Sequence, residues 1–111
     1  MYVRCAYFEG DVDPADRERF DSFMEAEIMP RLAKMPRVRA VRLLRGRAFE
    51  DDAPHFYQTI EQDYDSLEDI QNALASEIRA ALREKLLEIM PLFEGRLSHI
   101  NHDVTTVPII G

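Results

Sequence analysis

The chain has 111 residues, of which 46% are hydrophobic and 32% are charged, a composition typical of one globular domain rather than of a disordered segment. Its 21 acidic residues outnumber its 14 basic ones and give a formal charge of −7, which disfavours nucleic acid or an anionic membrane as a partner. No apolar run approaches the roughly 20 residues of a membrane span, no signal-peptide core is present, and the single cysteine, Cys5, is typical of a reducing cytoplasm.

The first half of the chain begins with a strand and a helix. Alternating apolar residues predict a strand over residues 2–8, and residues 9–11 are expected to turn the chain. Asp13 is a typical N-cap before a proline, so a helix is predicted over residues 14–34. Pro30 lacks a backbone donor and crowds the preceding turn, and we therefore expect a kink or a break near Met29.

The remaining elements complete two strand–helix–strand halves. Residues 38–45 and 55–63 alternate as two strands, which an exposed acidic segment connects. Helical spacing follows over residues 66–90, where capping signals at Ser66 and Ser76 predict two pieces. Residues 95–104 alternate again as the last strand.

This order of elements specifies a fold class. A β-α-β unit repeated head to tail predicts an α+β ferredoxin-like βαββαβ sandwich, with a four-stranded antiparallel sheet and its helices on one face. We expect a single domain over residues 1–104 and a C-terminal tail over residues 105–111. The tail ends in the apolar Val107-Pro108-Ile109-Ile110, which makes it a candidate for packing on a dimer partner.

The alternate positions of the four strands form two sets. The more apolar set is expected to face the helices and comprises Val3, Cys5, Tyr7, Val41, Leu43, Phe56, Ile60 and Ile100. The mixed set comprises Arg4, Ala6, Phe8, Ala40, Arg42, Leu44, Tyr57, Thr59, Glu61, Leu97, His99 and Asn101. Because the mixed set is too apolar for a solvent face and too charged for an ordinary core, we expect it to pair with a second copy of the chain and to enclose a cavity.

The candidate site residues belong to this mixed set. His99 is a candidate acid–base group, although a hydrogen-bonded interface histidine explains it as well. Arg4 and Arg42 are suited to a carboxylate or an enolate, and an ion pair with Glu61 is the structural alternative. The remaining candidate ligand-binding residues are Tyr57, Glu61 and Asn101.

Several other site classes are disfavoured. His99 and His102 are three apart on one strand and so point to opposite faces, and we predict no metal site and no cofactor. Residues 55–59 lack the Gly-aromatic motif of RNA-recognition sheets, and no phosphate-binding glycine loop is present.

Two segments carry a resemblance to a known family. Residues 20–36 (FDSFMEAEIMPRLAKMP) and 64–76 (YDSLEDIQNALAS) resemble the EthD-like group of dimeric α/β-barrel proteins. The resemblance implies that two sheets pair face to face and that a ligand pocket lies between sheet and helices. Its members include cofactor-independent oxygenases, isomerases and polyketide-tailoring enzymes. The histidine that members commonly carry before the proline of the first helix is absent, because residues 27–30 read EIMP.

The sequence therefore favours a cytoplasmic homodimer that binds a small, partly apolar organic molecule. Whether the chain is an enzyme stays open at this point. One alternative is a cofactor-independent oxygenase, isomerase or polyketide-tailoring-type enzyme in which His99 acts as acid–base. Another is a purely structural dimer with no ligand.

Overall fold

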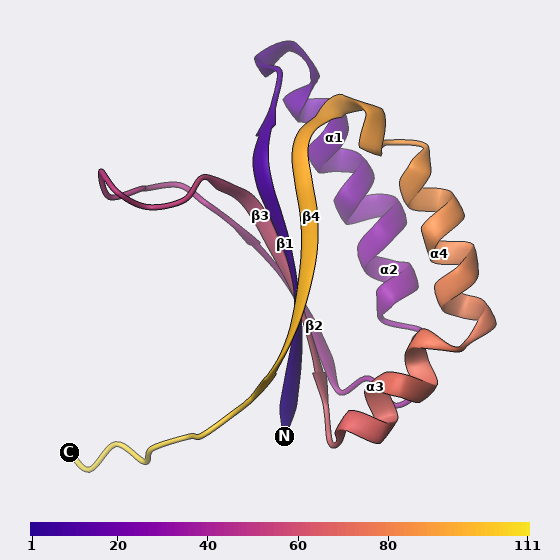
Figure 1. The fold of residues 1–111 in the computed structure, drawn as a ribbon, viewed down its shortest axis with the longest axis vertical. Helices are drawn as coiled ribbons and strands as arrows, with labels where there is room; N and C mark the ends of the chain where they lie inside the picture. The colour runs from indigo at the N-terminus through magenta and orange to yellow at the C-terminus, as the bar shows by residue number, and fades with distance from the viewer.

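The computed structural model describes all 111 residues and contains one antiparallel sheet with every helix on the same side (Figure 1). The strands are β1 (Tyr2–Val12), β2 (Ala40–Arg45), β3 (Phe56–Tyr64) and β4 (Phe93–Asp103), in the spatial order β2-β3-β1-β4. The helices are α1 (Arg17–Phe23), α2 (Met29–Leu32), α3 (Leu67–Leu74) and α4 (Glu77–Leu87). The predicted ferredoxin-like sandwich is thereby confirmed, and the opposite face of the sheet is uncovered in the single chain.

The first helical segment is continuous but irregular. A 3₁₀ turn over Pro14–Asp16 leads into α1, and the Asp13 carboxylate accepts a hydrogen bond from the amide of Ala15 (2.9 Å). Between α1 and α2 the backbone forms a π-helical turn over Met24–Ile28. This turn lies just before Pro30, and its wider hydrogen bonding accommodates the proline without the break that was one of the expected outcomes.

The second helical segment divides where the capping signals predict. The hydroxyl of Ser66 accepts from the amide of Asp69 at the start of α3 (3.1 Å). The hydroxyl of Ser76 accepts from the amide of Arg79 at the start of α4 (3.3 Å). Each cap satisfies a backbone donor that the helix leaves free, so two short helices form in place of one long one.

Strand β1 is longer than predicted, and the expected turn at residues 9–11 is wrong. Gly10 lies opposite Gly95 in the β1–β4 pairing, and both have positive φ, +147° and +150°. Because neither residue has a side chain, the two backbones can approach closely and the ladder continues as far as Val12 and Phe93.

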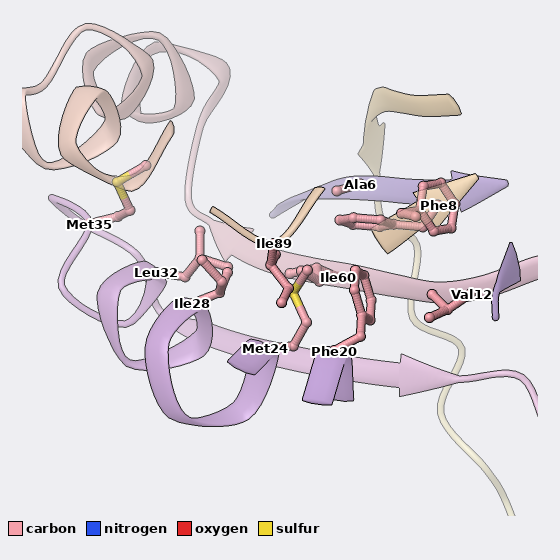
Figure 2. Packing of buried hydrophobic residues seen from close by; sticks show 11 residues of the cluster. Ala6, Phe8, Val12, Phe20, Met24, Ile28, Leu32, Met35, Ile60 and Ile89 are labelled. Atoms are coloured by element: carbon pink, nitrogen blue, oxygen red, sulfur yellow. The ribbon is translucent and has the colours of Figure 1, made fainter. Parts of the chain in front are cut away.

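The main core lies between the sheet and the first helical segment. Met24, Ile28 and Leu32 are buried and pack in one cluster with Ile60 of β3, as Figure 2 shows. At the other end of the cluster, Phe20 stacks on Phe93, with ring centroids 6.1 Å apart. By contrast, no residue of α4 is fully buried, which indicates that this helix covers the sheet loosely.

The assignment of strand positions to the two faces was partly wrong. Arg4, Ala6 and Phe8 of β1 point toward the helices, and so do Leu97 and His99 of β4. The opposite face carries Val3, Cys5, Tyr7, Phe56 and Ile100, which had been expected under the helices. For Val41, Leu43 and Ile60 the assignment holds. Because β1 is apolar at both sets of positions, its own pattern does not distinguish the faces.

Candidate functional site

A cavity lies between the sheet and the helices of the single chain. Its volume is about 290 Å³, at the lower end of the range for small-molecule sites. Strand residues form one wall, with Ala6, Phe8 and Ile60 at its centre. The helical wall comprises Ile28, Leu32, Met35, Leu74, Arg79, Leu82, Arg83 and Leu86. The pocket therefore lies inside one chain, not between two sheets.

The polar groups of the strand wall come from three strands. Arg4 of β1 donates to the side-chain oxygen of Asn101 on β4 (3.0 Å). Gln62 of β3 accepts from the hydroxyl of Tyr64 (2.8 Å). His99 of β4 lines the same cavity beside Arg4, and no other side chain hydrogen-bonds to its ring. Donors thus gather at one part of a mostly apolar pocket.

One face of helix α4 contributes half of the residues of the helical wall. Arg79, Leu82, Arg83 and Leu86 are spaced i, i+3, i+4 and i+7, which places them on one face of the helix. These leucines line the cavity and remain partly exposed. Sequence reasoning found the apolar spacing but missed the two arginines within it, although their position on that face was readable.

The electrostatics of the cavity centre on His99. Partial withdrawal from water, together with the positive charges of Arg4 and Arg79, lowers the pKa of His99 to about 4. The imidazole is therefore neutral at physiological pH. The pKa of Arg4 is also lowered, first by burial and then by Arg79, and its guanidinium stays charged.

The structure does not bring all the predicted site residues together. Arg4 and His99 share the cavity, and Asn101 is bound to Arg4 at its edge. Arg42 and Glu61 lie on the uncovered face of the sheet, on neighbouring strands, where their side chains pair with each other (2.7 Å).

Tyr57 has a different role from the one expected. A bulge in the β1–β3 pairing changes the alternation next to it. The Tyr57 ring packs edge-on against Phe20, and its hydroxyl donates to Asp21 of α1 (2.8 Å). Burial and this carboxylate raise the pKa of Tyr57 to about 12, so the residue ties α1 to the sheet and does not line the pocket.

The uncovered face of the sheet carries a polar network of its own. Arg42 bonds Asp63 through both terminal nitrogens (2.8 and 2.6 Å) in addition to Glu61. The hydrogen bond from Arg42 lowers the pKa of Asp63. Beside this pair, the hydroxyl of Tyr7 lies 2.7 Å from Nε2 of His102. In this network one guanidinium pairs with two carboxylates, so one negative charge remains uncompensated.

Two further properties bear on the kind of site. No group of three or more His, Cys, Asp or Glu side chains is arranged to hold a metal ion. None of the helices has both the length and the apolar character required to cross a bilayer.

Comparison with solved structures shows that other proteins share this ferredoxin-like fold. No protein-family model matches the sequence, and no curated protein is similar to it. An EthD-family protein from Bacillus halodurans shares 21% identity over 95% of this chain and 99% of its own, with a TM-score of 0.75. SnoaB, a cofactor-independent oxygenase from Streptomyces nogalater, shares 20% identity over 97% of each chain (TM-score 0.64). A dimeric protein of unknown function from Bacteroides fragilis with a ferredoxin-like fold shares 17% identity over 93% of this chain and 95% of its own (TM-score 0.62). At these identities the likeness establishes the fold.

Proposed function

We propose that this protein binds a small, partly apolar organic molecule in the cavity between the sheet and helices α2 and α4. The observation that carries the proposal is the cavity itself, which is mostly apolar and has Arg4 and His99 at one part of its wall. An apolar pocket with a few convergent polar groups is the usual form of a small-molecule site. An open pocket beside His99 also favours ligand binding over a purely structural dimer.

The test is ligand-dependent thermal stabilisation with a matched pair of variants. A panel of small organic acids, alcohols and ketones is screened for compounds that raise the melting temperature, because a ligand that binds only the native state stabilises it. Leu82→Trp fills the cavity from α4 and is expected to abolish the shift. Leu87→Trp makes the same change on the same helix at a side chain that is 69% exposed, outside the cavity, and should leave the shift intact.

We propose catalysis as a second function because His99 and Arg4 adjoin in one apolar cavity and because SnoaB, which shares the fold, is a cofactor-independent oxygenase. The low pKa of His99 makes its imidazole a weak base, which reduces its value as a proton acceptor at neutral pH. For any compound that binds, turnover under air is compared between the wild-type protein and His99→Ala. Full retention of turnover would exclude an acid–base role for His99.

We also propose that the uncovered sheet face pairs with a second copy to form a dimeric α/β barrel. The side chain of Ile100 on this face is 51% exposed, and Leu44 lies exposed on β2. The tail after β4 runs away from the helices toward the uncovered side, with Ile109 and Ile110 almost fully exposed (Figure 1). Apolar groups so exposed favour a partner surface, and the tail is suited to pack on that second copy. The free thiol of Cys5 accords with the cytoplasm as its location.

A further inference from the structure

The cavity is positively charged although the chain as a whole is acidic. Arg4, Arg79 and Arg83 line it, and no lining residue is an aspartate or a glutamate. All three arginines also lack a carboxylate within ion-pair distance. Because the chain has 21 acidic and only 14 basic residues, most arginines are expected to find a carboxylate, and three unpaired arginines around one cavity are unexpected.

Other arginines of the strands are paired with carboxylates. Arg42 pairs with Glu61 and Asp63 on the uncovered face. Arg45, at the end of β2, pairs with Glu25 of the helical layer (2.7 Å). Arg4 differs from both, since its only side-chain partner is the neutral amide of Asn101. A guanidinium that is half withdrawn from water and lacks an anionic partner has donors to spare.

The charges converge from opposite walls of the cavity. Arg4 extends from β1 and Arg79 from α4, and the positive charge of each contributes to lowering the pKa of His99. The neutral His99 adds no charge of its own but offers a ring N–H donor. Two like charges facing one apolar space repel each other, and an anion between them would turn this repulsion into attraction.

We propose that the ligand is an organic anion whose carboxylate, or another singly charged oxyanion, lies between Arg4 and Arg79, with its apolar body against the leucine and isoleucine side chains. This inference rests on the proposed binding function and narrows it to a class of ligand. Arg83, one helical turn beyond Arg79 and exposed to solvent, adds a third positive charge that attracts the anion. The apolar lining and the lack of a glycine-rich loop disfavour inorganic phosphate and nucleotides.

The experiment uses two fluorescent probes that differ in charge. Anilinonaphthalene sulfonate and phenylnaphthylamine share an aromatic body, and only the first carries an anionic group. Both are titrated into the wild-type protein, Leu82→Trp and Leu87→Trp. Loss of binding in Leu82→Trp alone shows that a probe occupies the cavity. If neither probe responds to Leu82→Trp, both the proposed binding function and this inference are overturned.

The charge is then removed from the helical wall. Arg79→Gln is expected to weaken sulfonate binding about tenfold, the scale of one lost charge-assisted hydrogen bond, and to leave phenylnaphthylamine binding within about twofold. Arg19→Gln is the matched control, because Arg19 lies exposed on α1 outside the cavity and also lacks an ion pair. If both probes occupy the cavity but Arg79→Gln weakens them equally, or weakens neither, the binding function survives and the anion inference is overturned.

Discussion

At the scale of single residues, His99 links the stability of the protein to pH. Its pKa of about 4 in the folded chain lies below the 6.5 of a free histidine. Between these values the unfolded chain binds a proton that the folded chain does not bind, so the free energy of unfolding falls as the pH falls through this window. Above pH 6.5 both forms are neutral, and His99 contributes no pH dependence.

This behaviour can be measured directly. In an NMR titration of the three histidines, we expect the ring of His99 to remain neutral down to about pH 4. The melting temperature of the wild-type protein should fall more steeply between pH 6.5 and 4 than that of His99→Asn, which lacks the titrating ring. Carboxylates titrate in both proteins, so only the difference between the two curves reports on His99. A ring that titrates near pH 6.5 would contradict both the withdrawal of His99 from water and the effect of the charges of Arg4 and Arg79 on it.

At the scale of elements, the close pairing of β1 and β4 near one end of the sheet depends on Gly10 and Gly95. An added Cβ at Gly10 would overlap the carbonyl oxygen of Glu94, and the positive φ adds strain for any other residue. We expect Gly10→Ala to lower the free energy of unfolding by about 1–3 kcal/mol, the usual range for a residue forced into such a conformation. Chemical denaturation measures this loss, and Gly111→Ala, where an added Cβ meets nothing, should be neutral. An unchanged denaturation midpoint in Gly10→Ala would contradict the close approach.

The elements also show which features a sequence can reveal. The caps Asp13, Ser66 and Ser76 were predictable because each acts within three residues of itself. The orientation of β1 and β4 was not predictable, since both strands have apolar residues at both alternating sets of positions. Which set faces the helices depends on contacts distant in sequence. A packed core excludes Arg4 and His99, so the sequence predicts that they face away from the helices, whereas they border a cavity between the sheet and the helices.

The same limit applies to the site as a whole. The sequence analysis identified Arg4 and His99, which line the cavity, and Asn101 at its edge, from their chemistry and their place in the mixed set of strand positions. The sequence analysis placed Arg42 and Glu61 in the same group. In the structure these two residues pair on the opposite, uncovered face of the sheet. Arg79 was missed, because a helical arginine beside leucines is ordinarily a solvated group. Only the three-dimensional arrangement shows that α4 directs this arginine toward Arg4.

At the scale of the whole molecule, the two sheet faces have different tasks. The covered face borders the cavity. The uncovered face carries exposed apolar side chains, which favour burial against a second copy, beside the ion pairs of Arg42 with Glu61 and Asp63. Pairing this face would leave the cavity between sheet and helices intact. Ligand binding and dimerisation are therefore separable by mutation.

We expect Ile100→Glu to disrupt the dimer, because it places a carboxylate on the proposed interface, where pairing would withdraw an unpaired charge of each protomer from water. Light scattering at micromolar concentration should show a dimer for the wild-type protein and a monomer for Ile100→Glu. Leu87→Glu makes the same change at an exposed leucine of α4, on the opposite side of the molecule, and should remain dimeric. Far-ultraviolet circular dichroism confirms that each variant is folded, and the anionic probe should still bind the monomer since the cavity lies within one chain. A wild-type protein that is monomeric at this concentration would remove the interface, and the exposed side chains of the sheet and tail would then need another explanation.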